Sequence, residues 1–97
     1  MDTLEWLEHF LLVNSDGDWE HYETITIENL NNLGWRVEIL FPESVAYETK
    51  PTSFHYEASD EDWWNYKIEE DRFIASGSPN NLSNILKCLR KLVEDEL

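Results

Sequence analysis

Apolar residues at both ends of the chain recur at intervals of three and four, the spacing that places side chains on one face of a helix. Near the N-terminus this pattern predicts an amphipathic helix over residues 3–14, which Asp2 or Thr3 can cap. Near the C-terminus, Ser78 can cap a second helix whose first residue is Pro79, because the fixed φ of proline suits that position. The apolar positions are Leu4, Trp6, Leu7, Phe10, Leu11 and Val13 in the first helix, and Leu82, Ile85, Leu86, Leu89, Leu92 and Val93 in the second.

The middle of the chain changes to an alternation of apolar and polar residues, which is typical of strands with one buried face. Strands are expected around residues 24–27, 35–41, 54–58, 64–68 and 73–76. The runs NNLG at 31–34, SDED at 59–62 and EEDR at 69–72 have the composition of turns. Residues 42–51 have no clear period, so we expect a long loop there.

These elements predict an α+β fold in a single domain over residues 1–97. Each helix has one apolar face and the strands alternate, so we expect a five-stranded antiparallel meander sheet with the N-terminal and C-terminal helices packed on one face. The opposite face of the sheet then stays open to solvent or to a partner. By strand parity this open face carries Thr24, Thr26, Arg36, Glu38, His55, Glu57, Trp63, Asn65 and Lys67.

Trp63 is unusual on such a face because its neighbours there are polar. A tryptophan on a polar surface is a typical anchor of a protein–protein interface, since its ring buries a large area with little loss of rotamer entropy. The alternative is that its ring covers the loop at residues 42–51.

The charge of the chain narrows the classes of partner. Asp and Glu number 21 against 7 Lys and Arg, which gives a formal net charge of −14. Direct binding to nucleic acid or to an anionic membrane is therefore not expected, whereas a basic protein would be attracted. The alternative reading is that the acidic surface serves solubility. No apolar run approaches the roughly 18 residues of a membrane span, and no secretory signal is visible, so we expect a cytoplasmic protein.

The sequence contains no clear catalytic, cofactor or metal motif. Cys88 is the single cysteine, and nearby cations could lower its pKa. Reactive thiols normally lie in loops or at helix N-termini, so we expect a half-buried cysteine within a helix. Asn14, Asp16 and Asp18 imitate the start of a calcium loop, but the glycine and glutamate that such a loop needs are missing. We therefore predict no enzyme activity, no cofactor and no metal site.

Several runs stand out by their residue types and order: DGDWEH at 16–21, NNLGW at 31–35, Asp62 with Trp63, Phe73, and GSPNNL at 77–82. Together they resemble the immunity protein 53 family of bacterial polymorphic toxin systems. The resemblance implies an α+β cytoplasmic protein that binds a toxin made beside it and protects the producing cell, without catalysis. On this reading the chain is one immunity-protein-like domain and a stoichiometric inhibitor. Two alternatives are an acidic mimic of nucleic acid that binds another basic protein, and a small thiol enzyme.

The candidate partner-binding residues lie in three places: the polar loop around Trp19, the open face of the sheet around Trp63, and the acidic turn that follows residue 58. In the loop, Trp19 either folds back over the sheet edge or the first helix, or forms part of a rim that binds the toxin. The candidates are Asp16, Asp18, Trp19, Glu20, His21, His55, Glu57, Asp60, Glu61, Asp62 and Trp63.

Overall fold

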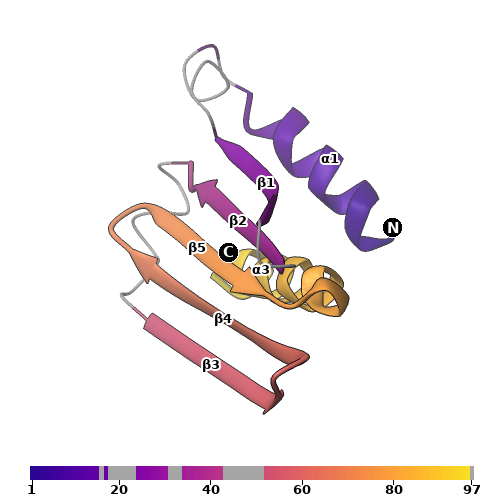
Figure 1. Cartoon of the computed structure of the whole chain (residues 1–97). Coiled ribbons are helices and arrows are strands. Elements are labelled where there is room, and N and C mark those ends of the chain that lie inside the picture. Colours follow the sequence, from indigo (N-terminus) through magenta and orange to yellow (C-terminus); the bar gives the residue numbers. More distant parts are fainter. Residues whose placement is uncertain (16, 18–23, 31–33, 43–51, 97) are drawn as a thin grey trace.

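The computed structural model describes residues 1–15, 17, 24–30, 34–42 and 52–96. In chain order the elements are α1 (Thr3–Val13), β1 (Ile25–Leu30), β2 (Gly34–Leu40), β3 (Thr52–Ser59), β4 (Asp62–Glu69), β5 (Arg72–Gly77), the 3₁₀ turn η2 (Pro79–Asn81) and α3 (Leu82–Glu96) (Figure 1). The expected order of helix, five strands and helix is confirmed.

The five strands form one antiparallel sheet in the order β1-β2-β5-β4-β3 (Figure 1). The α+β class and the five-stranded antiparallel sheet are confirmed, but the expected meander order is wrong. β2 pairs with β5, and β3 lies at the far edge. Burial explains this order: β5 carries Phe73 and Ala75, which are 0% and 1% exposed, and it runs directly into η2 and α3. β5 therefore takes a central place in the sheet.

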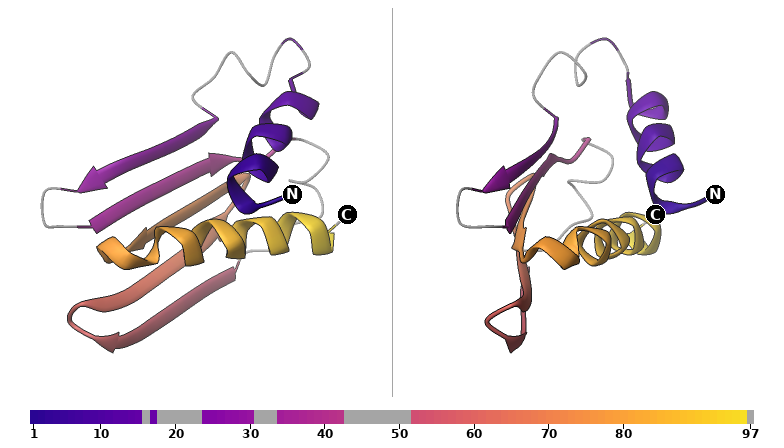
Figure 2. Two further views of the ribbon diagram at one scale, coloured as in Figure 1. Left: turned by 90° about the vertical axis from the view of Figure 1, so that its right-hand side faces the viewer. Right: turned by 45° about the vertical axis from the view of Figure 1, so that its right-hand side comes forward.

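Both helices lie on the same face of the sheet, as the sequence predicts (Figure 2). The core fills the space between this face and the helices, and α1 also packs against α3. Its buried apolar residues are Trp6, Phe10, Val37, Ile39, Phe41, Ile68, Phe73, Ala75, Ile85, Leu86, Leu89 and Val93.

The strand register separates the two faces of the sheet. Val37 pairs with Ala75 and Ile39 pairs with Phe73, and all four side chains are buried on the helix side. Residues at the alternate positions point to the open face. This placement is confirmed for Thr26, Arg36, Glu38, His55, Glu57, Trp63, Asn65 and Lys67.

Thr24, also expected on the open face, is buried rather than open to solvent. It precedes β1 and is only 5% exposed. Its carbonyl oxygen accepts a hydrogen bond from the N–H of Leu40 at 2.8 Å. The backbone of Thr24 therefore adds one more hydrogen bond to the β1–β2 pairing, just before β1 begins.

Helix α1 begins at a capping box. Asp2 Oδ1 accepts from the N–H of Glu5 at 2.8 Å, and Glu5 Oε1 accepts from the N–H of Asp2 at 3.3 Å. The bond from the Glu5 backbone lowers the pKa of the Asp2 carboxyl. Trp6 and Phe10 are buried with their rings 5.2 Å apart, so this side of the helix packs on the core. Other apolar residues expected on that side are exposed: Leu4, Leu11 and Val13.

Candidate functional site

One corner of the fold brings together residues from separate runs of the sequence. Gly34 begins β2 and Gly77 ends β5, and a Cβ atom at position 34 would lie 2.7 Å from the carbonyl oxygen of Gly77. The close approach of these two backbones therefore requires glycine. The neighbouring Trp35 donates from its indole Nε1 to the carbonyl oxygen of Pro79 at 2.9 Å. These contacts fasten β2 to the turn before α3.

Asn81 is the centre of this corner and is 1% exposed. Its Nδ2 lies within hydrogen-bonding distance of Asp62 Oδ1 at 3.0 Å, the Trp63 carbonyl oxygen at 3.1 Å and Ser78 Oγ at 2.7 Å. Its Oδ1 accepts from Asn84 Nδ2 at 2.8 Å. The side chain thus ties the start of β4 to the start of α3. We call the following residues the motif corner: Gly34, Trp35, Asp62, Gly77, Ser78, Pro79 and Asn81.

Ser78 stands at the cap position before η2, but its hydroxyl makes no capping hydrogen bond. The expected cap position and the proline after it are confirmed, but the side-chain capping bond is absent because the hydroxyl is engaged elsewhere. Ser78 Oγ accepts from the N–H of Trp63 at 3.2 Å and lies 3.1 Å from the Trp63 carbonyl oxygen, while the N–H of Ser78 donates to that same oxygen at 2.9 Å. Both backbone groups of Trp63 are therefore held by one residue.

On the open face, the end of the β3–β4 hairpin forms a hollow of about 350 Å³. His55 pairs with Asn65 and Glu57 pairs with Trp63 across the two strands. His55 Nε2 lies 3.2 Å from Glu57 Oε2, and both side chains are exposed. We call this site the tip hollow, and it is lined by His55, Glu57, Asp60, Trp63 and Asn65.

The tip hollow unites four of the residues that the sequence nominates, namely His55, Glu57, Asp60 and Trp63. Two further candidates, Glu61 and Asp62, lie between Asp60 and Trp63 in the sequence. Glu61 is exposed and its N–H donates to Ser59 Oγ at 3.2 Å. Asp62 faces the motif corner through Asn81, so its carboxylate already has an internal partner.

Strand parity places Asn65 on the open face, but Asn65 is not among the candidate site residues predicted from the sequence. Its pairing with His55 could have revealed it. The remaining candidates lie outside the described residues: Asp16, Asp18, Trp19, Glu20 and His21. Their role stays a prediction.

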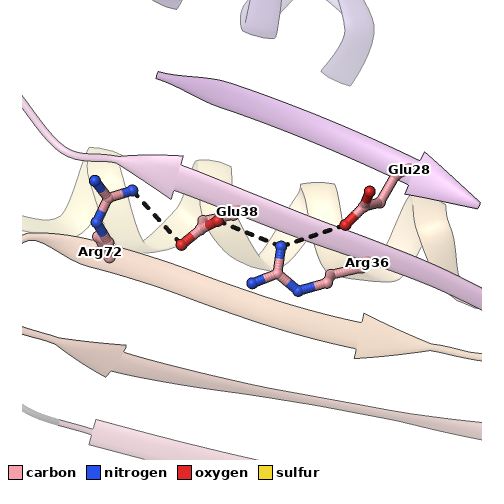
Figure 3. Close-up of polar contacts among 4 residues, drawn as sticks. All are labelled: Glu28, Arg36, Glu38 and Arg72. Carbon is pink, nitrogen blue, oxygen red and sulfur yellow. Dashed lines mark hydrogen bonds and ion pairs between the residues drawn. The ribbon is translucent and has the colours of Figure 1, made fainter. Parts of the chain in front are cut away.

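A row of alternating charges crosses the rest of the open face from β5 through β2 to β1 (Figure 3). Arg36 Nη1 lies 3.4 Å from Glu28 and 3.3 Å from Glu38. Arg72 Nη1 lies 3.5 Å from the other oxygen of Glu38. This row balances its own charge. Within the described part of the chain, in contrast, no Lys or Arg forms an ion pair with Glu57, Asp60 or Glu61.

The helix side of the same hairpin carries a group of aromatic residues, whose strand positions alternate with those of the open face. Phe54 and Tyr56 of β3 are 40% and 41% exposed. The ring of Phe54 lies 4.8 Å from that of Trp64 and 5.5 Å from that of Tyr66. Tyr66 in turn stacks on the buried Phe73 at 5.3 Å. We call this group the aromatic face: Phe54, Tyr56, Trp64 and Tyr66.

Cys88 lies half-buried within α3, as the sequence predicts. Burial raises the pKa of its thiol and outweighs both a hydrogen bond with Tyr66 and the charge of Lys91. Burial also raises the pKa of the Tyr66 hydroxyl, with a further contribution from Cys88. The thiol is therefore protonated at neutral pH, the opposite of what an activated nucleophile needs.

Across the described residues, no group of three or more His, Cys, Asp or Glu side chains is arranged to hold a metal ion. In the same part of the chain, no helix is both long enough and apolar enough to cross a membrane.

Comparison with known proteins gives one match. A family model described as Immunity protein 53 matches residues 4–94, which is nearly the whole chain. Neither the curated proteins nor the solved structures contain a match. The resemblance found in the sequence runs is therefore confirmed at the level of the family.

Proposed function

The chain belongs to the Immunity protein 53 family, and on this basis we propose that it binds a cognate toxin and neutralises it in a stoichiometric complex. The partner on this proposal is a bacterial toxin with a basic surface, met in the cytoplasm of the cell that makes both proteins. Nucleic acids and membranes are not direct partners, because their phosphate groups would be repelled by a chain of net charge −14.

The tip hollow is the observation that carries this proposal. It places the carboxylates of Glu57 and Asp60 beside the half-buried ring of Trp63, in a depression that a side chain can enter. Among the described residues, no Lys or Arg pairs with these two carboxylates, and the neighbour of Glu57 is His55 at 3.2 Å. A concave acidic surface next to an indole ring suits a Lys or Arg side chain, which gains both charge pairing and a cation–π contact.

The motif corner supports this surface from behind. Ser78 holds both backbone groups of Trp63, so the backbone that carries this ring is fixed before a partner arrives. A pre-organised site loses less entropy on binding and therefore binds more tightly. The net negative charge further speeds the encounter with a basic partner.

Inhibition rather than catalysis is proposed for two reasons. The family is named for immunity proteins, and the pKa of Cys88 is raised by burial, which disfavours a thiolate nucleophile. Neutralisation by occupancy needs only a complementary surface.

The test uses the polypeptide encoded by the toxin gene beside this one. Both proteins are mixed at increasing ratios, and the mass of the complex is measured by light scattering while toxin activity is followed. We expect a one-to-one complex and activity that falls linearly until the two are equimolar. Full protection at a small fraction of equimolar would instead indicate an enzyme. Equal affinity for unrelated basic proteins would favour the nucleic-acid mimic, and no complex at micromolar concentration would refute the proposal.

A further inference from the structure

We propose that the outer edge of β3 accepts an extended segment of the toxin, which adds to the sheet as a further strand beside β3. This inference rests on the proposed function and specifies how the partner is recognised. Strand addition supplies affinity through main-chain hydrogen bonds and specificity through side chains that alternate between the two faces.

The edge itself is the first argument. β3 has eight residues, all exposed, and among the strands of the described chain it pairs with β4 alone at the end of the sheet (Figure 1). An edge strand presents unpaired N–H and C=O groups, which proteins usually protect with proline, lysine or a bulge. β3 contains neither proline nor lysine, and its register shift is confined to the end, between Glu57 and Ser59. The run from Thr52 to Glu57 is therefore a regular template.

The aromatic face is the second argument. Phe54 and Tyr56 point to the helix side of the sheet, yet each is about two fifths exposed. Their neighbours Trp64 and Tyr66 pack against the core, and Tyr66 stacks on Phe73. Apolar side chains of an added strand would lie next to these rings and bury them, which is the cross-strand contact that stabilises sheets.

Charge identifies the occupant. On the other side of β3, an added strand would pass His55, Glu57 and the nearby Asp60, so basic residues suit its alternate positions. A second copy of this chain would bring the same acidic groups together and add a second net charge of −14. The segment that fits is therefore a toxin strand in which apolar and basic side chains alternate.

The experiment compares two lysine substitutions on opposite edges of the sheet. Tyr56→Lys places a charge on the helix side of β3, and Ile27→Lys places one on the helix side of β1, where the native residues are similarly exposed at 41% and 38%. The ligand is the polypeptide encoded by the adjacent toxin gene, and thermal melts establish that both variants fold. We expect Tyr56→Lys to weaken binding by about tenfold or more, and Ile27→Lys to change it less than about threefold.

Amide hydrogen exchange on the unmodified proteins gives a second test that does not depend on variants. Backbone amides of β3 should exchange at least about tenfold more slowly in the complex than in the separate protein. Unchanged exchange in β3, with binding still present, would overturn the strand-addition inference and leave the proposed function intact. Failure of the parent protein to bind would refute both. Protection of β3 that depends on concentration without toxin would identify a second copy as the occupant.

Discussion

The motif corner and the outer part of the β3–β4 hairpin use their polar groups in opposite ways. In the motif corner, Ser78 and Asn81 are each 1% exposed and bond to backbone and side-chain groups of β4 and η2. In the hairpin, every residue of β3 is exposed and the carboxylates of Glu57 and Asp60 have no Lys or Arg partner among the described residues. The runs that carry the family resemblance thus include buried residues of the motif corner, while much of the surface that we propose for the partner lies outside them.

Trp63 connects the two regions. Its backbone belongs to the network of Ser78 and Asn81, and its side chain lines the tip hollow. The corner therefore positions the hollow, and the two regions are separable by mutation: changes in the corner should reduce stability, and changes in the hollow should reduce binding.

The largest effect is expected from Asn81→Ala. This variant removes the amide that lies near Asp62, Trp63 and Ser78, and with it the hydrogen bonds of a side chain that is 1% exposed. We expect a loss of about 3 kcal/mol in the free energy of unfolding, which lowers the melting midpoint by about 10–20 °C. Thermal melts followed by circular dichroism measure it. Ser83→Ala, an exposed change in the first turn of the following helix α3, is the control and should lie within about 0.5 kcal/mol of the parent. Equal melts of the two variants would show that the corner does not hold the fold.

The next effect is expected from the double variant Trp63→Ala with Glu57→Lys in the tip hollow. The backbone bonds between Trp63 and Ser78 remain, so folding should be retained with a smaller loss of stability than in Asn81→Ala. Affinity for the toxin should fall by about 2 kcal/mol, a factor of about 30. Calorimetric titration measures it.

Glu8→Lys is the charge-matched control for this double variant. It makes the same change of charge as Glu57→Lys at an exposed position of α1, on another element. It should weaken binding by less than about threefold. If it weakens binding as much as the double variant does, only net charge matters and the hollow has no specific role.

The sequence predicted which face of the sheet each strand residue occupies, but not which strands lie side by side. Alternation places Val37 and Ala75 on the helix side whatever strand lies beside them, so the period predicted burial and left the order undetermined. Asp62 illustrates the same limit. Its sequence context predicts a solvated turn residue. Its carboxylate instead accepts a hydrogen bond from the side-chain amide of Asn81, 19 positions away, which the pairing of β4 with β5 brings close. Contacts of this range depend on the strand order.

The aromatic face was missed for a geometric reason. Phe54 and Tyr56 have the parity of buried residues, and parity alone predicts that helices cover them. A helix is about 10 Å wide and strands lie about 4.8 Å apart, so two helices cover roughly four strands of five. Edge strands are therefore the least covered, and in β3 both helix-side aromatic residues, Phe54 and Tyr56, remain about two fifths exposed.

A smaller effect than that of the tip-hollow variants is expected from salt, which should slow the association of the unmodified protein with the toxin. The Debye length shortens from about 30 Å at 0.01 M salt to about 8 Å at 0.15 M, which screens the attraction between an acidic inhibitor and a basic toxin. We expect the association rate to fall by about tenfold over this range, with little change in dissociation. Stopped-flow mixing measures both. An association rate that stays flat with salt would remove electrostatic steering, while leaving the contacts of the tip hollow to be judged by affinity.

The smallest effect at neutral pH is expected from Cys88→Ala, and its pH dependence separates a structural thiol from a reactive one. Stability near pH 7 should stay within about 1 kcal/mol of the parent, because the side chain is half-buried and small.

Burial raises the pKa of Cys88 in the folded state, so the folded protein holds the thiol proton more tightly than the unfolded chain does. That contribution is present below the ordinary thiol pKa and is lost as the pH rises past it. The parent should therefore lose more stability than Cys88→Ala between about pH 8 and pH 10 in chemical unfolding. Parallel curves would contradict the buried-thiol assignment, and loss of toxin neutralisation by the folded variant at neutral pH would restore a chemical role for Cys88.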